Sequence, residues 1–338
     1  MISPKNKKVD ISAEVGSVHD GSFGNALNLI EYCAKMGADV VKFQTHISEA
    51  ETLKNAPMPP AFKGEPRFEY FNRTSFDKEQ WKELKRKCDL EEIEFMSSPF
   101  SIEAVNLLEN LKMQRYKIPS GEVTNLPMLD LIAQTEKQIL LSTGMSTISE
   151  IEDALETINK YHNNIIILQC TSEYPCTLEN VGLNIMESFA RKYSLPVGLS
   201  DHTPSIFASL AAVSLGAVYI EKHFTFSKEM YGSDAKYGIE PNEFKYLIEG
   251  IREIEIIQDH FIDKNIVAKN KENIKMIYEK SIVLKKDLKK GDSVTNDVIA
   301  YKKPGNGIKP KEVSKILNKT INKDIKANTL LKYDDFIS

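Results

Sequence analysis

The sequence predicts an α/β fold: a closed (β/α)8 barrel followed by a small C-terminal domain. Over roughly the first 260 residues, eight short apolar runs alternate with stretches of helical periodicity. Strands that alternate with helices form parallel βαβ units, and eight such units match the number that closes a barrel. A doubly wound open sheet is the second candidate, but the chain contains neither a GxGxxG nor a Walker A motif.

The predicted strands are short apolar runs rich in residues that favour β-structure. They are expected at 9–15, 39–45, 92–97, 115–120, 138–142, 165–170, 195–199 and 218–224. Between them, apolar residues recur three and four positions apart, as Leu27, Ile30 and Ala34 do in the first helical stretch. Helices are expected at 25–36, 78–88, 102–111, 148–161, 206–215 and 241–257, the last one starting near Pro241.

One segment of the predicted barrel, 47–77, is much longer than a usual strand–helix connection. It is rich in proline and aromatic residues, including Pro57-Met-Pro-Pro-Ala-Phe and Phe68-Glu-Tyr-Phe. Loops of this length in compact domains are usually functional, so we expect a lid or a dimer contact here.

The chain changes character near residue 260, where an irregular charged stretch predicts a linker. We therefore expect a barrel domain at 1–262, a linker at 263–278 and a small domain at 279–338. From residue 279 onward there are 14 lysines and 8 acidic residues, a net charge of +6, whereas the rest of the chain carries −10. Short strands and tight turns are expected around 281–284, 287–292 and 301–307.

Composition excludes several classes of protein. The chain is 41% hydrophobic with a net charge of −4, and it contains no apolar run of about 18 residues, so we expect no membrane span. Four cysteines without a CxxC pair predict a reduced, cytoplasmic protein with no disulfide framework. The C-terminal lysines alternate with acidic residues and lack an aromatic stacking platform, which argues against nucleic-acid binding.

Polar residues gather where each predicted strand ends. Examples are Ala13-Glu-Val-Gly, Lys42-Phe-Gln-Thr-His, Ser97-Ser-Pro-Phe and Glu221-Lys-His-Phe. Active sites of barrels lie at the carboxyl ends of the strands, and burying charge elsewhere is costly. The pattern therefore predicts one binding site at the mouth of the barrel.

Two histidines, His202 and His223, end consecutive predicted strands. Neighbouring strands lie about 4.8 Å apart, so both imidazoles can reach one ion. Neutral imidazoles together with oxygen ligands suit a divalent transition metal. The competing interpretation is a pair of hydrogen-bonded core histidines; His19 and His46 also lie at strand ends and are weaker candidates as ligands.

Lys42 and Lys117 are expected at the same mouth, within a ring of serine hydroxyls. This set suits a small phosphorylated or carboxylated anion, although any single serine could instead cap a helix. The ring comprises Ser98, Ser120, Ser142, Ser172 and Ser200.

The carboxylates Glu14, Glu122 and Glu221 can carry protons or bind ligands, or they can pair with the lysines. Glu221 and His223 lie two residues apart on a strand and therefore share a face. Cys170 is expected to be a small buried side chain rather than a catalytic thiol.

These motifs resemble the sialic acid (nonulosonate) synthase family. The resemblance rests on residues 14–21, Lys42-Phe-Gln-Thr-His, Tyr116-Lys-Ile-Pro-Ser-Gly-Glu, Cys170-Thr-Ser-Glu-Tyr-Pro, Gly198-Leu-Ser-Asp-His-Thr and Ile220-Glu-Lys-His-Phe. The tail, with Lys289-Lys-Gly-Asp and Lys303-Pro-Gly-Asn-Gly, is similar to the antifreeze-like (SAF, β-clip) domain that ends those enzymes.

The resemblance implies condensation of phosphoenolpyruvate with an N-acylated hexosamine, giving a nonulosonic acid and phosphate. It implies a divalent metal, Mn or Mg, held by His202 and His223. It also implies a domain-swapped homodimer in which the antifreeze-like domain of one subunit covers the barrel mouth of the other.

The matched motifs also imply which residues bind the substrates. Lys42 and Lys117 would hold the carboxylate of phosphoenolpyruvate, and the serine ring would hold its phosphate. The sugar would face Gln44, Glu122, Tyr174 and Asp234. Either Glu14 or Glu221 could move the proton of water.

Three positions depart from the family pattern: Val18 before His19, Ser172 in place of a frequent asparagine, and Lys303 in place of an arginine. Lysine cannot form the planar bidentate contact of arginine, so recognition of the acyl group by Lys303 would differ. The sugar therefore stays open between N-acetylmannosamine and a diacetamido-trideoxyhexose. Two rival functions remain: a Schiff-base pyruvate aldolase using Lys42, Lys117 or Lys222, and a non-catalytic sugar-binding barrel.

Overall fold

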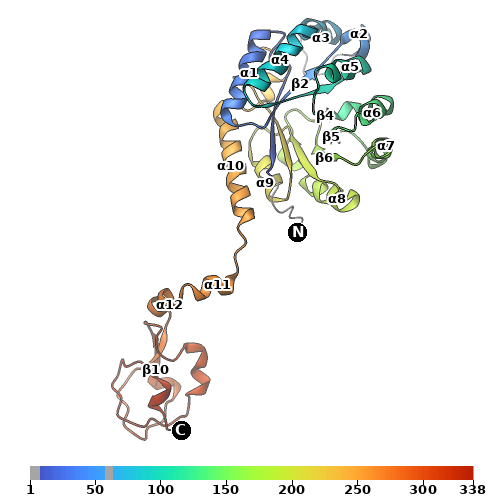
Figure 1. Cartoon of the computed structure of the whole chain (residues 1–338). Coiled ribbons are helices and arrows are strands. Elements are labelled where there is room, and N and C mark those ends of the chain that lie inside the picture. Colours follow the sequence, from blue (N-terminus) through green and yellow to red (C-terminus); the bar gives the residue numbers. More distant parts are fainter. Residues whose placement is uncertain (1–7, 58–63, 338) are drawn as a thin grey trace. The chain divides into compact units, whose positions relative to one another are not determined.

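A computed structural model describes residues 8–57 and 64–337 of the chain (Figure 1). The described part of the chain divides into two compact units, and the boundary between them in the sequence falls between His260 and Phe261. The first unit holds the barrel and the second holds the small C-terminal domain, and each is described here by itself. None of the helices in the described ranges combines the length and the apolar character that a membrane span requires.

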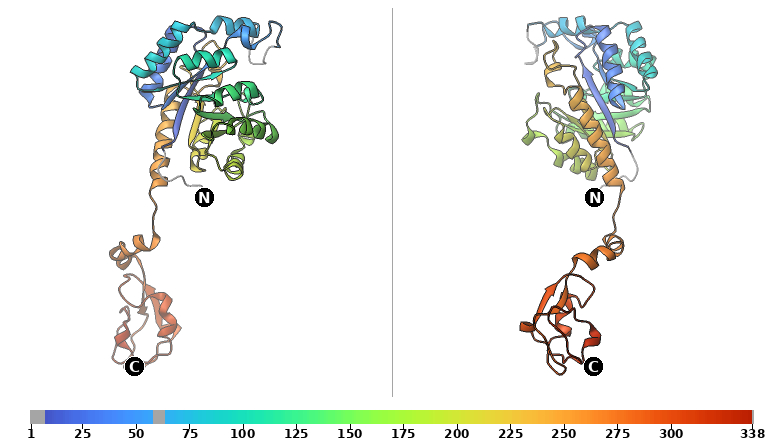
Figure 2. Two further views of the ribbon diagram at one scale, coloured as in Figure 1. Left: turned by 45° about the vertical axis from the view of Figure 1, so that its right-hand side comes forward. Right: turned by 90° about the vertical axis from the view of Figure 1, so that its left-hand side faces the viewer.

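Within residues 8–57 and 64–337, eight parallel strands form the wall of the barrel (Figures 1 and 2). They are β1 (Asp10–Gly16), β2 (Val40–Thr45), β3 (Glu94–Pro99), β4 (Arg115–Ile118), β5 (Gln138–Ser142), β6 (Ile165–Cys170), β7 (Val197–Asp201) and β8 (Tyr219–His223). The hydrogen-bonded order is β3-β2-β1-β8-β7-β6-β5-β4, and its two end strands, β3 and β4, also lie in contact. The predicted barrel is confirmed.

Helices cover the outside of the barrel, and local sequence explains where several begin. Asp77 and Thr147 each form a capping box with the side chain three residues later. Pro241 opens the last helix of this unit, as its fixed backbone angle favours. The covering helices are α1 (Phe23–Met36), α4 (Lys78–Leu90), α5 (Ile102–Asn110), α6 (Leu126–Ala133), α7 (Ile148–Asn159), α8 (Leu183–Tyr193), α9 (Phe207–Ser214) and α10 (Pro241–Asp259).

The long segment 47–77 contains two short helices, α2 (Ser48–Glu51) and α3 (Arg67–Thr74). The centre of the predicted lid, 58–63, lies outside the described residues. Helix α3 buries Phe68, Tyr70 and Phe71, and the Tyr70 hydroxyl lies 3.3 Å from the hydroxyl of Ser233. The segment is therefore anchored to the loop after β8.

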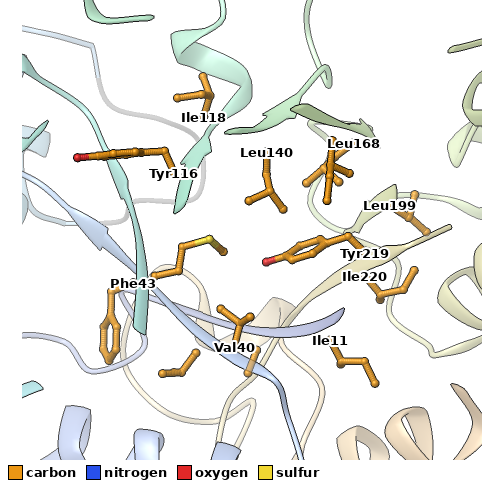
Figure 3. Packing of buried hydrophobic residues seen from close by; sticks show 14 of the residues in the cluster. Ile11, Val40, Phe43, Tyr116, Ile118, Leu140, Leu168, Leu199, Tyr219 and Ile220 are labelled. Atoms are coloured by element: carbon orange, nitrogen blue, oxygen red, sulfur yellow. The ribbon is translucent and has the colours of Figure 1, made fainter. Parts of the chain in front are cut away.

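The interior of the barrel is a packed apolar layer beneath a polar mouth. Figure 3 shows Val40, Leu140, Leu168 and Tyr219 among the buried side chains of this core. Tyr219 precedes Glu221 by two positions, and Leu140 precedes Ser142 likewise, so each pair shares the inward face of its strand. The apolar layer keeps the polar residues above it in a poorly solvated environment.

The second unit has its own core around a short antiparallel pair, β9 (Ser281–Leu284) and β10 (Ile299–Lys302). Its buried residues include Ile282, Leu284, Val294, Ile316 and Leu331. The range 263–278, predicted as a linker, contains α11 (Lys264–Lys269) and α12 (Glu272–Tyr278). Helix α11 forms because the Asp263 side chain accepts hydrogen bonds from the first backbone amides of the turn.

Candidate active site

Two lysines and two glutamates form one buried network at the mouth of the barrel. The Lys42 ammonium lies 2.6 Å from Oε2 of Glu14 and 3.7 Å from Oε2 of Glu221. The Lys117 ammonium lies 2.6 Å from Oε1 of Glu221, which also accepts a hydrogen bond of 3.0 Å from Ser200. The strand register explains this meeting, because Glu14 is opposite Lys42 in one ladder and Glu221 is opposite Ser200 in another.

The two carboxylates of this network have opposite electrostatic environments. Burial raises the pKa of Glu14 to about 7, although the ion pair with Lys42 acts in the other direction. Burial also acts to raise the pKa of Glu221, but Lys117 and Lys42 outweigh it and lower this pKa to about 2. Glu221 is therefore a fixed anion at neutral pH, whereas Glu14 can gain or lose a proton there.

A second group of side chains meets at Gly16, the last residue of β1. Gln44 donates a hydrogen bond of 2.7 Å from Nε2 to Oε1 of Glu14. The carboxylate of Asp234 accepts hydrogen bonds from the backbone and the hydroxyl of Ser17, at 2.9 and 2.8 Å. A Cβ atom on Gly16 would lie 2.4 Å from Oδ2 of Asp234, and its φ of +47° favours glycine. Gln44 and Asp234 therefore line the same corner as Glu14.

The predicted pair His202 and His223 lies together, with ring centroids 5.5 Å apart. Tyr174 stacks on His202 at 4.1 Å, and its hydroxyl lies 3.1 Å from Nε2 of that ring. Nδ1 of His202 is 2.8 Å from the carbonyl oxygen of Thr171, an acceptor that fixes the ring proton on Nδ1. Nε2 of His202 is then left with a lone pair that points toward Tyr174.

These histidines fit a divalent metal as two of its ligands. Burial lowers the pKa of His223 to about 4, so the ring is neutral at pH 7 and can coordinate a metal. Its Nδ1 is buried and has no hydrogen-bond partner among the described residues. In the same part of the chain, no cluster of three or more His, Cys, Asp or Glu side chains offers a complete site. Water or a substrate would have to supply the remaining ligands.

The serines separate into two groups. Ser98 lies 3.3 Å from the Lys42 ammonium and belongs, with Ser200, to the charged network. Ser120 and Ser172 converge on Gly144, where an added Cβ would lie 2.8 and 2.5 Å from their hydroxyl oxygens. The hydroxyl of Ser142 is buried and has no partner within the described ranges. Hydroxyls of this second group are available to an anion.

Three predicted residues stand apart from these contacts. Glu122 interacts with the amide of Asn125 at 2.9 Å, and burial raises its pKa. Lys303 belongs to the second unit, where its ammonium lies 5.1 Å from the centre of the Tyr278 ring. Lys222 points to the outer side of β8 and pairs with Asp201 at 2.9 Å, so it does not face the mouth.

Several residues of the site escaped the sequence analysis. Gly144 and Ser17 contribute through backbone geometry, for which the sequence gives only a weak signal. Cys170, expected to be an inert buried side chain, lies 3.9 Å from Nδ1 of His202. His46 is not at the metal candidate: it stacks between Phe71 and Phe100, with ring centroids 3.7 and 4.1 Å away.

Comparison with known proteins assigns the chain to a family. The model of the NeuB family matches residues 29–263, and that of the SAF domain matches residues 279–337. The chain belongs to the NeuB family. The N,N'-diacetyllegionaminic acid synthase of Campylobacter jejuni is 41% identical over 337 residues, which cover 96% of this chain and 99% of that protein. The pseudaminic acid synthase of Helicobacter pylori is 33% identical over 338 residues, covering 96% and 97%.

A solved structure supports the same assignment. The N-acetylneuraminic acid synthetase of Leptospira borgpetersenii, in complex with citrate, superposes with a TM-score of 0.70 at 28% identity. The match covers 81% of this chain and 95% of that one. The expected family, the barrel with a C-terminal SAF domain, and the enzyme class are therefore confirmed: this NeuB-family member is a nonulosonic acid synthase.

Proposed function

We propose that this synthase condenses phosphoenolpyruvate with the open-chain aldehyde of an N-acylated amino sugar, giving a nonulosonic acid and phosphate. The observation that carries the proposal is a buried carboxylate, Glu221, bracketed by the ammonium groups of Lys42 and Lys117. A pocket with two buried ammonium groups can stabilise a small dianion or trianion that water would otherwise solvate.

Phosphoenolpyruvate would use both parts of the mouth. Its carboxylate would lie against Lys42 and Lys117, near Ser98 and Ser200. Its phosphate would take hydrogen bonds from Ser120 and Ser172, whose hydroxyls converge on Gly144, and from Ser142, whose hydroxyl has no partner among the described residues. This arrangement leaves the enol carbon free to face the sugar.

His202 and His223 would hold a divalent cation, Mn or Mg, which would supply Lewis-acid polarisation of the aldehyde oxygen when bound. Two observations support this role: Nε2 of His202 meets only the Tyr174 hydroxyl, at 3.1 Å, among its described hydrogen bonds, and Nδ1 of His223 has no hydrogen-bond partner among the described residues.

Side chains of this protein would then accept and donate the protons of the reaction. A carbon–carbon bond forms between the enol carbon and the aldehyde carbon, and the aldehyde oxygen becomes an alkoxide, which finally receives the proton that Glu14 takes from water in the next step. Water adds to the cationic C2, which the ionised Glu221 stabilises, and Glu14 accepts the first proton of that water. The bond between C2 and the phosphate oxygen breaks, phosphate leaves with the second proton, and a 2-keto acid remains.

The sugar is proposed to be a diacetamido-trideoxyhexose. Removing the three carbons of phosphoenolpyruvate from N,N'-diacetyllegionaminic acid leaves such a sugar, and the synthase named for that acid is 41% identical to this chain. Gln44, Tyr174, Asp234 and Glu122 are proposed to face it. Lys303 would contribute from the SAF domain of a second subunit, in a domain-swapped homodimer. The four free buried cysteines suit a reducing compartment such as the cytoplasm.

The test is incubation of the full-length chain with phosphoenolpyruvate, Mn and a panel of N-acylated hexosamines, followed by phosphate release and product mass. We expect turnover with the diacetamido sugar, and an unlabelled phosphate in heavy-oxygen water because the C–O bond breaks. Preference for N-acetylmannosamine would overturn the sugar assignment. Phosphate release without any sugar dependence, or borohydride trapping of a pyruvate imine, would overturn the condensation.

A further inference from the structure

An ion pair lies buried on the outer face of the barrel, next to the two histidines of the metal candidate. Lys222 of β8 and Asp201 of β7 are opposite each other in the parallel ladder, and the ammonium lies 2.9 Å from Oδ2 of the carboxylate. Both side chains are 0% exposed. His202 directly follows Asp201 in the chain, and His223 directly follows Lys222. The pair therefore joins the two strands one residue before each proposed metal ligand.

The same pair also fixes the backbone on the far side of His202. Oδ1 of Asp201 accepts a hydrogen bond of 2.8 Å from the backbone N–H of Thr203. The Lys222 ammonium donates to the carbonyl oxygen of Thr203 at 2.5 Å and lies 3.3 Å from its hydroxyl. The residues before and after His202 are thus tied to one ion pair. This restricts the backbone of His202, as a metal ligand requires, because its position has to be held within about 0.5 Å.

A further contact comes from helix α9, which covers this side of the barrel. The Ser209 hydroxyl donates to Oδ2 of Asp201 at 2.6 Å, and Ser209 is completely buried. Groups from β8, from α9 and from the turn after β7 therefore all bind one carboxylate. Asp201 cannot rotate without breaking a hydrogen bond to at least one of them.

Stability alone does not explain charged residues at this place. The cost of desolvating two buried charges offsets most of their attraction, and apolar side chains in place of such a pair are often neutral or stabilising. Two positions earlier on the same face of the same ladder, Leu199 lies opposite Ile220, and both are buried (Figure 3). Apolar packing is thus sufficient there, whereas the charged pair occupies the position next to the histidines.

We propose that Lys222 and Asp201 are positioning residues that hold His202 and His223 at the spacing that a shared divalent cation requires. Both side chains point away from the mouth, so each acts through the histidine that follows it. The rings lie with their centroids 5.5 Å apart, and the pair fixes the two strand ends that carry them. This inference rests on the metal site of the proposed function and deepens it.

The first test is calorimetric titration of the chelator-treated, full-length protein with Mn alone. Lys222→Met leaves the buried carboxylate without its cation, so it should lower both stability in urea and Mn affinity. Adding Asp201→Asn removes that charge and keeps an acceptor for the N–H of Thr203, so stability should recover in part. We expect Mn affinity to stay about tenfold below wild type in both variants, as substitutions behind metal ligands typically cause. Recovery of Mn affinity in the double variant would overturn the positioning role.

Two further variants separate positioning from a general loss of stability. Ser209→Ala removes one hydrogen bond to Asp201 and leaves the ion pair, so the protein should fold and bind Mn about threefold more weakly. Arg115→Ala breaks ion pairs that join β4 to β3 and β1, away from the histidines, and should keep wild-type Mn affinity. Unchanged Mn affinity in Ser209→Ala, or a tenfold loss in Arg115→Ala, would overturn the proposal.

His223→Ala distinguishes a failure of this inference from a failure of the metal site. Mn binding that is unchanged in His223→Ala would overturn the metal site and this inference with it. Mn binding that is lost in His223→Ala but equal to wild type in the double variant would overturn the positioning role alone.

Discussion

Glu14 and Glu221 are the same residue type in one cavity, yet their surroundings separate their charge states. The pKa of Glu14 rises to about 7 because burial outweighs its ion pair with Lys42, whereas the two lysines lower the pKa of Glu221 to about 2. Paired titratable groups with pKa values pushed apart are typical of acid–base sites. The structure therefore favours Glu14 over Glu221 as the proton carrier, an alternative that the sequence left open.

The raised pKa of Glu14 predicts the pH dependence of the enzyme. Below about pH 7 Glu14 is protonated and cannot accept a proton, so kcat/KM should rise about tenfold per pH unit and level off above that pH. Glu14→Gln should lose this limb and about 10²–10⁴-fold in kcat. Steady-state rates between pH 5 and 9 measure this, with Glu122→Gln as the control that keeps the limb. A wild-type profile flat through pH 7 would contradict the assignment.

Gly16 is the position where a single methyl group should close the site. Gly16→Ala would place Cβ 2.4 Å from Oδ2 of Asp234 and would strain a backbone at φ +47°. We expect kcat/KM to fall by about 10²-fold or more, because a displacement of about 1 Å in a catalytic site has that effect. Gly37→Ala is the matched control, since its φ is +92° but its new Cβ would meet only Ile248 at 3.8 Å. It should lose stability and keep kcat.

The histidine pair predicts a metal-binding defect that can be measured without turnover. His223→Ala removes the buried ring whose Nδ1 has no partner in the described ranges, so Mn affinity should fall by at least tenfold. Calorimetric titration of the chelator-treated protein measures this, with circular dichroism to check the fold. His19→Ala is the control, because His19 packs on Phe76 with ring centroids 4.5 Å apart. Unchanged Mn binding in His223→Ala would refute the assignment.

At the scale of elements, the barrel depends on the contact between its two end strands. Arg115 of β4 forms a bidentate pair with Glu94 of β3 at 2.7 Å and also pairs with Asp10 of β1 at 2.6 Å. Its side chain is 11% exposed, so these ion pairs are poorly solvated. Side chains thus join β3 to β4, which are the ends of the hydrogen-bonded order.

This contact predicts a stability effect far from the active site. Arg115→Ala leaves Glu94 without its partner, and we expect the free energy of unfolding to fall by about 2–3 kcal/mol. Arg115→Lys should recover only part of this, because lysine cannot form the bidentate pair. Urea denaturation measures both, and Arg86→Ala, which removes an exposed pair with Glu83, should leave the midpoint almost unchanged. Equal midpoints for Arg115→Ala and Arg86→Ala would contradict the role of this contact.

Helices and strands could be predicted from the sequence where a local pattern of apolar residues is enough to specify them. Hydrophobic runs and helical periodicity gave the barrel strands and helices such as α1 and α10. The short helices α2 and α3 lie in a stretch whose aromatic residues have no clear period, so they depend on packing against the barrel. The expected linker contains α11, which the Asp263 side chain caps, and α12, which has no side-chain cap.

For the whole molecule, two separate hydrophobic cores predict two independently folding units. Residues 1–260 and 261–338, expressed separately, should each show a cooperative thermal transition by circular dichroism. We expect the barrel alone to retain little turnover, because the proposed sugar contact at Lys303 lies in the second unit. A barrel fragment with full kcat and an unchanged KM for the sugar would contradict that contact.

By itself, the sequence determined the fold class and the family and supplied the candidate site residues, because hydrophobic periodicity and strand-end motifs are local properties of the chain. It also placed Glu14, Lys42, Lys117 and Glu221 at one mouth, since parallel strands present their carboxyl ends together. Only the tertiary structure decided which groups touch: register pairs Lys42 with Glu14, burial separates the two carboxylate pKa values, and packing brings His46 behind Gln44. These contacts and pKa values depend on distances of a few ångströms between residues far apart in the sequence, and on the exclusion of water from the site. Local sequence patterns do not specify either of them.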